Sequence, residues 1–150
     1  MELLEQYHEG IIALSACLAG EVQKYLLRGM YGDAMDAAFR YQKIFGKENF
    51  FLELQDHGMQ EQQLVNQQLI RLSQETGIEL VATNDVHYTY AKDEKPHDML
   101  LCIQTGKKLS DENRMRYEPQ NFYLRSEEEM RALFPAYPEA ITNTLEVLDK

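Results

Sequence analysis

The chain has 150 residues, about the length of one domain, and 44% of them are hydrophobic, which is enough for a single core. It carries 15 Lys and Arg against 25 Asp and Glu, a formal net charge of -10, so bulk charge would not hold nucleic-acid phosphates on its surface. No apolar run approaches the roughly 18 residues of a membrane span, and the acidic N-terminus lacks the apolar core of a secretory signal. Two cysteines, Cys17 and Cys102, do not make a disulfide framework, so we expect a cytoplasmic protein without membrane partners.

Short apolar runs alternate with segments of helical periodicity, a pattern typical of α/β proteins with parallel strands. Three runs predict strands, at residues 11–14, 50–54 and 80–82. Buried parallel strands have this appearance because both faces of the sheet are covered. Residues 122–124 are a weaker fourth candidate.

Apolar residues at helical spacing predict a helix in each interval between these runs. Their apolar faces are formed by Val22, Tyr25 and Leu26; by Ala34, Ala38, Tyr41 and Phe45; by Val65, Leu69 and Leu72; and by Met99, Cys102 and Ile103. Gly46 and Gly77 follow two of these helices as stop signals, and Pro96 suits the first turn of another.

The composition changes near Gly106, after which residues 107–121 are polar and read as a connector. Ser126 and Glu129 then form a capping box, and Pro138 opens a last helix. The apolar residues of that last helix, which we expect to face inward, are Ile141, Leu145 and Leu148. We therefore divide the chain into residues 1–108 and a mainly helical extension, 109–150, and expect it to be cut from a longer protein.

Polar side chains that can bind a metal follow each of the three predicted strands. Cys17 comes after the first, Asp56 and His57 after the second, and Asp85 and His87 after the third. In parallel β/α folds the carboxyl ends of the strands lie at one edge, where reactive groups collect. The sequence therefore predicts a site at this edge.

Asp85 and His87 are the strongest candidates for metal ligands, because positions i and i+2 of an extended segment face the same side. Zinc and manganese accept such mixed oxygen and nitrogen ligands. A D-x-H pair is also common by chance. The alternative is that Asp85 caps a turn and His87 is a surface histidine.

The other candidates have structural alternatives of similar or greater weight. Cys17 is either a thiolate ligand or a small buried hydrophobe, and Cys102 lies in an apolar stretch that suits the core. His57 fits a turn before a helix, or alternatively a ligand or supporting role at the same edge. Glu53, inside an apolar strand, either hydrogen-bonds in a barrel interior or sits at an exposed end. His97 is better explained by packing than by metal binding.

Several motifs of other chemistries are missing from the sequence. It has no G-x-x-x-x-G-K-S/T phosphate loop, no G-x-G-x-x-G, no G-x-S-x-G elbow and no C-x-x-C pair. The aromatic residues follow helix and strand spacing, which favours a core over a base-stacking platform.

Six stretches together resemble the DNA polymerase III alpha subunits of bacteria, in the same order and from end to end. They are EGIIALSACLAGEV (9–22), FFLELQDHG (50–58), VATNDVHY (81–88), PHDMLLCIQTGK (96–107), NFYLRSEEEMRALFP (121–135) and PEAITNTLEVLDK (138–150). Within that family the match lies in the polymerase and histidinol phosphatase (PHP) domain, a distorted seven-stranded β/α barrel. The resemblance implies that Cys17, Asp85 and His87 match ligands of a zinc or manganese cluster. It carries no ligand role over to His57, and His57 and Glu53 stay candidates for a supporting role beside the ligands.

The resemblance has one large departure. The family domain begins with an H-x-H motif, which this sequence lacks, so the chain is similar to the second half of the barrel and the start of its connection to the polymerase. No catalytic residue is identified, and the Mg-dependent DNA-directed DNA polymerase activity is implied only for the whole subunit. The module itself is expected to be a metal-dependent 3′-5′ exonuclease or phosphoesterase, or its inactive relic. Two alternatives stay open, a scaffold that docks a proofreading exonuclease and, apart from the resemblance, a small stand-alone metal-dependent hydrolase.

The resemblance also implies partners: the remainder of the alpha subunit, and replicase holoenzyme subunits that include a proofreading exonuclease. DNA would be contacted through the whole protein rather than through this acidic segment.

Overall fold

The computed structural model describes all 150 residues, which form a mixed α/β structure. Its elements in chain order are α1 (Glu2–Gln6), β1 (Ala13–Leu14), α2 (Glu21–Leu27), α3 (Tyr31–Phe45), β2 (Phe50–Leu54), α4 (Gln60–Thr76), β3 (Leu80–Ala82), the short 3-10 helix η1 (Ala91–Asp93), α5 (Glu94–Thr105), α6 (Glu127–Leu133) and α7 (Pro138–Leu148). No helix is both long enough and apolar enough to cross a bilayer. Both cysteines are free thiols.

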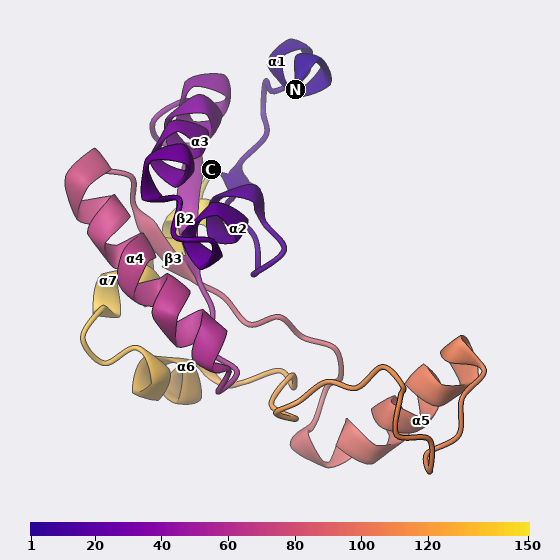
Figure 1. Cartoon of the computed structure of the whole chain (residues 1–150). Helices are drawn as coiled ribbons and strands as arrows, with labels where there is room; N and C mark the ends of the chain where they lie inside the picture. The colour runs from indigo at the N-terminus through magenta and orange to yellow at the C-terminus, as the bar shows by residue number, and fades with distance from the viewer.

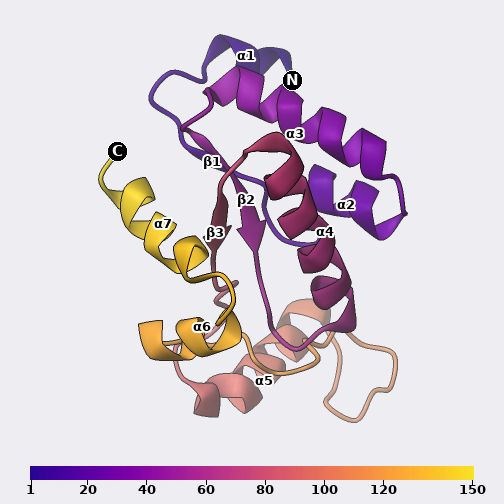
Figure 2. The ribbon, with the colours of Figure 1, turned by 90° about the vertical axis from the view of Figure 1, so that its left-hand side faces the viewer.

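The three predicted strands form one parallel sheet in the order β1-β2-β3 (Figure 2). β2 and β3 have the predicted bounds, whereas β1 is reduced to two residues because Ile11 is exposed and outside the ladder. The weak fourth candidate forms no strand: Tyr123 makes an isolated parallel bridge with Tyr88. The parallel α/β prediction is confirmed.

Helices flank the sheet (Figure 2), and all five residues of its central strand β2 are buried. α2, α3 and α4 lie together on one side, and α7 packs along β3 on the other (Figure 2). The predicted stop glycines are confirmed, since Gly46 and Gly77 end α3 and α4 at positive φ. The main core is a cluster of 19 buried residues, all of them drawn from residues 22–82 and 134–141.

Most of the chain between these two stretches lies apart from that core, and we call this part, residues 83–126, the outer segment. Figure 1 shows α5 and the following connector extending away from the sheet. Cys102 is buried on α5, as predicted, but it is not part of the main core cluster. Met99 and Ile103, expected on the same apolar face, are 50% and 77% exposed. α5 has few partners within the chain, so an apolar spacing does not bury its residues here.

The C-terminal extension packs beside the sheet. The capping box of Ser126 and Glu129 is formed, and the Asn143 side chain donates a hydrogen bond of 2.8 Å to the Leu80 carbonyl in β3. The expected inward face of α7 is only partly correct: Ala140 and Ile141 are buried.

Two residues of α7 that we expected to face inward are instead on the surface. Leu145 is 59% and Leu148 is 77% exposed. The reason is that only the first half of the helix lies against β3, which is three residues long. The division at residues 108 and 109 stays a prediction.

Candidate functional site

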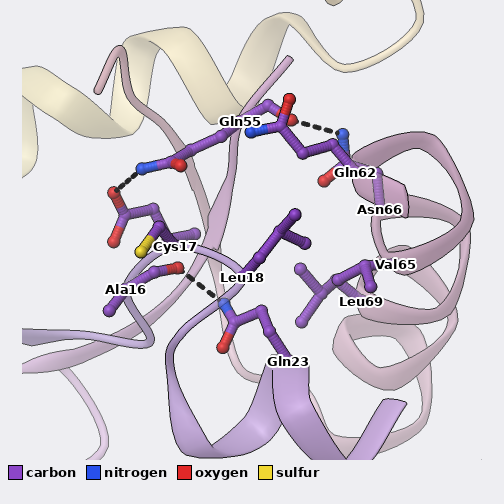
Figure 3. Close-up of a pocket in the computed structure, with 10 residues that line it drawn as sticks. Ala16, Cys17, Leu18, Gln23, Gln55, Gln62, Val65, Asn66 and Leu69 are labelled. Carbon is purple, nitrogen blue, oxygen red and sulfur yellow. Dashed lines mark hydrogen bonds between the residues drawn. The ribbon is translucent and has the colours of Figure 1, made fainter. Parts of the chain in front are cut away.

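The loop after β1 is held in one conformation by a side chain from α2. The Ser15 hydroxyl accepts hydrogen bonds from the Gln23 amide (2.7 Å) and from the backbone N–H of Glu53 (2.8 Å). The Gln23 amide also donates to the Ala16 carbonyl at 2.8 Å, a contact visible in Figure 3. Ala16 has a φ of 69°, the one non-glycine residue with positive φ. This loop places Cys17 at the carboxyl edge of the sheet.

Gly20 allows that loop to close. A Cβ on Gly20 would lie 2.2 Å from the Ser15 carbonyl oxygen and 2.6 Å from the Gln23 amide oxygen. No side chain fits at such distances, so any other residue would push the loop outward. The half-buried thiol of Cys17 therefore owes its position to a close backbone approach as well as to the strand before it.

Glu53 on β2 is buried and hydrogen-bonded, so it does not sit at an exposed end of its strand. Its carboxylate accepts hydrogen bonds from the Thr83 hydroxyl and, at 3.0 Å, from the Gln55 amide. Thr83 follows β3, so this group ties the ends of two adjacent strands together. A buried carboxylate with such partners stabilises the local geometry of the edge.

His57 lies in a bend just before α4, as predicted for a turn, but its side chain is completely buried. The imidazole stacks on Phe122 with ring centroids 4.3 Å apart and planes 7° from parallel. Burial, and secondarily the positive charge of Arg125, lowers the pKa of His57 below the usual 6.5. The imidazole is therefore neutral at physiological pH.

Asp85 and His87 do face each other, as their spacing predicted. His87 Nε2 lies 3.2 Å from Asp85 Oδ1, and both side chains are partly exposed. Rings of the outer segment surround His87: the centroids of Tyr117, Phe122 and His97 lie 4.3, 5.5 and 5.8 Å away. This packing agrees with the structural role expected for His97.

A hollow of about 340 Å³ brings residues of all three strand ends together. Cys17 and Asp85 both line it, beside Gln55 and Gln62. The outer segment forms another side, contributing Met115, Arg116, Tyr117, Glu118 and Phe122. His87 is not among the lining residues, although it contacts Asp85.

The donor chemistry of Cys17, Asp85 and His87 suits zinc, which accepts sulfur, oxygen and nitrogen ligands. Their placement in this chain fits a metal only in part. Two of the three line one hollow and two are in contact, but no group of three or more His, Cys, Asp or Glu side chains is placed to hold an ion. These 150 residues alone therefore do not complete a metal site.

Three residues of the site were missed by sequence reasoning. Gln62 lies on the buried side of α4, one turn before Val65, and a polar residue on an apolar stripe is the signal that could have indicated it. Tyr117 belongs to the polar connector, which has no periodicity and held no comparable signal. Phe122 was indicated only as part of the weak strand candidate at residues 122–124, not as a site residue.

Comparison with known proteins defines first a class of domain. Residues 1–57, which include β1, β2 and the loop that carries Cys17, match the PHP domain family. The parallel β/α arrangement, with polar side chains at the carboxyl ends of its strands, agrees with this match.

The curated relatives then show which proteins the chain is similar to over nearly its full length. The chain is 46% identical over 149 residues to DNA polymerase III subunit alpha of Treponema pallidum, covering 99% of this chain and 13% of that protein. The corresponding subunit of Borreliella burgdorferi is 43% identical over 147 residues, and that of Helicobacter pylori is 41% identical over 160, again with 13% of each covered. The resemblance is confirmed: over nearly its full length the chain is related to one segment of the DNA polymerase III alpha subunits, and it spans about 13% of their length.

Proposed function

We propose that the chain is the part of a DNA polymerase III alpha subunit that completes its PHP domain and connects it to the polymerase. In this proposal the sheet belongs to a larger β/α barrel whose other strands come from outside these 150 residues. The whole protein would be a Mg-dependent DNA-directed DNA polymerase, partnered by the other replicase subunits. The names and coverage of the relatives support this proposal.

Within that domain, Cys17, Asp85 and His87 would contribute to a divalent-metal site of zinc or manganese. The observation that carries the proposal is the shared hollow: Cys17 and Asp85 line it, and Asp85 contacts His87. When bound, such a metal activates a water and binds a phosphate, as 3′-5′ exonuclease or phosphoesterase chemistry requires. The three side chains of this segment would hold and orient the metal ion, while its remaining ligands would come from parts of the protein outside this segment.

The acidity of the segment is consistent with a role that does not include gripping DNA. The net charge of -10 opposes binding to phosphates, so a substrate would be held through the metal and through the rest of the protein. By itself the 150-residue segment would be inactive as a polymerase and as a nuclease.

The test uses a full-length alpha subunit that carries this segment. The double variant Asp85→Asn with His87→Gln removes the contacting pair, and Asp36→Asn with His8→Gln matches it at two exposed positions. We expect the first variant to lose bound zinc or manganese, measured by elemental analysis, and to lose 3′-5′ nuclease activity on a labelled primer. The matched control should keep both. Equal metal content in the two variants would refute the metal role.

A second candidate function is a non-catalytic scaffold that docks a separate proofreading exonuclease. Exposed apolar residues on α5, among them Leu100 (61%) and Ile103 (77%), favour this alternative, because a docking partner would cover them. The variant Ile103→Ser should then weaken co-purification of the exonuclease. The Asp85 and His87 variant should leave that association unchanged.

A further inference from the structure

The imidazole of His57 contacts two neighbouring side chains, Phe122 and Gln62. Its ring stacks on Phe122 at 4.3 Å, and its backbone N–H donates to Gln62 Oε1 at 2.7 Å. On the ring itself, Nδ1 lies 3.0 Å from Gln62 Nε2. The side chain is completely buried. One residue, Gln62, thus contacts both the backbone and the ring of His57.

These two contacts decide which ring nitrogen carries the proton. A backbone N–H can only donate, so the atom of Gln62 that faces it must be the amide oxygen, and the amide cannot be flipped. The NH₂ group of Gln62 then faces Nδ1, and because NH₂ is a donor, Nδ1 must present a lone pair. In the neutral ring the proton is therefore on Nε2.

That Nε2–H group is a buried donor for which the chain supplies no acceptor in direct contact. Buried donors in folded proteins nearly always find a partner. Asp85 lies close to this ring, because it lines the hollow together with Gln62 and Phe122, the two side chains that contact the imidazole. The other charged groups that act on His57 are Arg125 and Asp56. The Asp56 side chain already accepts a hydrogen bond from the Gly58 backbone, whereas Asp85 engages His87 through Oδ1.

We propose that His57 is a positioning residue, an Nε2–H donor locked by Gln62, which orients the Asp85 carboxylate through one water molecule and does not itself ligate metal. Asp85 would then be held from two directions, by His87 on Oδ1 and by His57 through the water. Carboxylates that bind metals are commonly fixed by such outer hydrogen bonds. This inference rests on the proposed function only for the role of Asp85; the tautomer and its lock are independent of it.

The test measures the ring nitrogens of His57 by long-range ¹H–¹⁵N correlation on the 150-residue chain labelled with ¹⁵N-histidine. We expect the Nε2–H tautomer, with an Nε2 proton that exchanges slowly with solvent. In Gln62→Glu, a carboxylate oxygen replaces the NH₂ group, so the proton should move to Nδ1 or the ring should become charged. An Nδ1–H tautomer in the unmodified chain would overturn the proposal.

A second experiment tests the proposed contact between His57 and Asp85. Asp85→Asn should speed the exchange of the His57 Nε2 proton and shift its resonance, whereas the exposed Asp36→Asn should leave both unchanged. Equal behaviour of these two variants would overturn the assignment of Asp85 as acceptor. Dispersed amide resonances in each variant show that the fold is retained.

A third experiment distinguishes failure of this inference from failure of the proposed metal site. Added zinc should leave the proton on His57 Nε2, while loss of that proton would mean that Nε2 ligates metal and would overturn the proposal. In the full-length subunit, His57→Phe keeps the stack on Phe122 but removes the donor, and we expect metal affinity to fall by roughly 10–100-fold. In the full-length subunit, zinc that fails to perturb Asp85 and His87 would count against the metal site, yet leave the tautomer result standing.

Discussion

The sheet with its helices and the outer segment are built from the same kind of sequence but are held together by different forces. All 19 residues of the main core lie in residues 22–82 and 134–141, and none lies in residues 83–133. The outer segment instead depends on aromatic contacts around His87 and on the Arg114–Asp98 ion pair, in which Nη2 lies 2.7 Å from Oδ2. Burial of apolar area is the larger stabilising force, so we expect the sheet region to determine global stability.

This difference between the sheet region and the outer segment indicates which wall of the candidate site can move. Cys17 stands on the rigid side, fixed by the loop after β1, whereas Tyr117 and Phe122 approach from the outer segment. The hollow therefore has one wall that belongs to the core and one that is attached by a few polar and aromatic contacts. Local opening of the second wall would expose the hollow without unfolding the first.

The largest expected effect comes from the core. Leu69 on α4 is fully buried, and Leu69→Ala should lower the free energy of unfolding by about 2–5 kcal/mol through lost burial and the cavity left behind. Leu64 is on the same helix but 59% exposed, and Leu64→Ala should cost less than about 0.5 kcal/mol. Urea unfolding followed by circular dichroism measures both. Similar losses for the two variants would contradict the assignment of stability to the sheet region.

The next effect concerns pH and the junction between the two regions, where His57 at the end of β2 stacks on Phe122. Burial lowers the pKa of His57 from 6.5, so near that pH the unfolded chain binds more protons than the folded one. Stability is therefore fully present above pH 6.5 and is lost as the pH falls below it, by at most about 1.4 kcal/mol per pH unit for one group. Burial lowers the pKa of His97 as well, which adds in the same direction.

Unfolding free energies measured between about pH 7.5 and about pH 5.5 test this expectation. His57→Gln should flatten the slope, and the exposed His8→Gln should not. A slope that is unchanged in His57→Gln would mean that the buried ring does not resist protonation.

A smaller effect is expected at the boundary between the outer segment and α6. The Ser126 hydroxyl accepts a hydrogen bond from the backbone N–H of Glu129, so Ser126→Ala should cost about 0.5–2 kcal/mol if α6 unfolds together with the core. Ser110→Ala, at an exposed turn position, should be neutral. No loss in either variant would place α6 with the outer segment, and so move the boundary of the sheet region toward α7.

Much of the sheet region could be predicted from the sequence because its signals are local. β2 and β3 were predicted with the correct bounds, since a short apolar run between turn residues has few alternatives. Gly77 after α4 has φ of 70°, a conformation that glycine adopts without strain, and the capping box of Ser126 uses residues three apart.

The features that sequence reasoning predicted wrongly or missed have one cause in common: they depend on contacts between residues far apart in the sequence. The exposure of Leu148 follows from the short length of β3, and the burial of His57 follows from Phe122, which comes after the connector. The sequence predicted that Asp85 would face His87, because that contact needs only alternation along an extended segment. Whether Cys17 joins them as a ligand stays a prediction.

The smallest effect on global stability, and the sharpest test of the comparison, is expected from Arg114→Lys. The Arg114 guanidinium binds both oxygens of Asp98 on α5, and a lysine ammonium cannot reproduce that two-point contact. We expect an unchanged urea midpoint but faster hydrogen exchange in α5 and the connector, measured by mass spectrometry. Arg116→Lys is the matched control, because Arg116 makes a single ion-pair contact of 3.8 Å with Glu118 at the surface. If Arg114→Lys lowered the midpoint as much as Leu69→Ala, the two regions would unfold as one unit, and the wall formed by the outer segment would be as firmly held as the wall that carries Cys17.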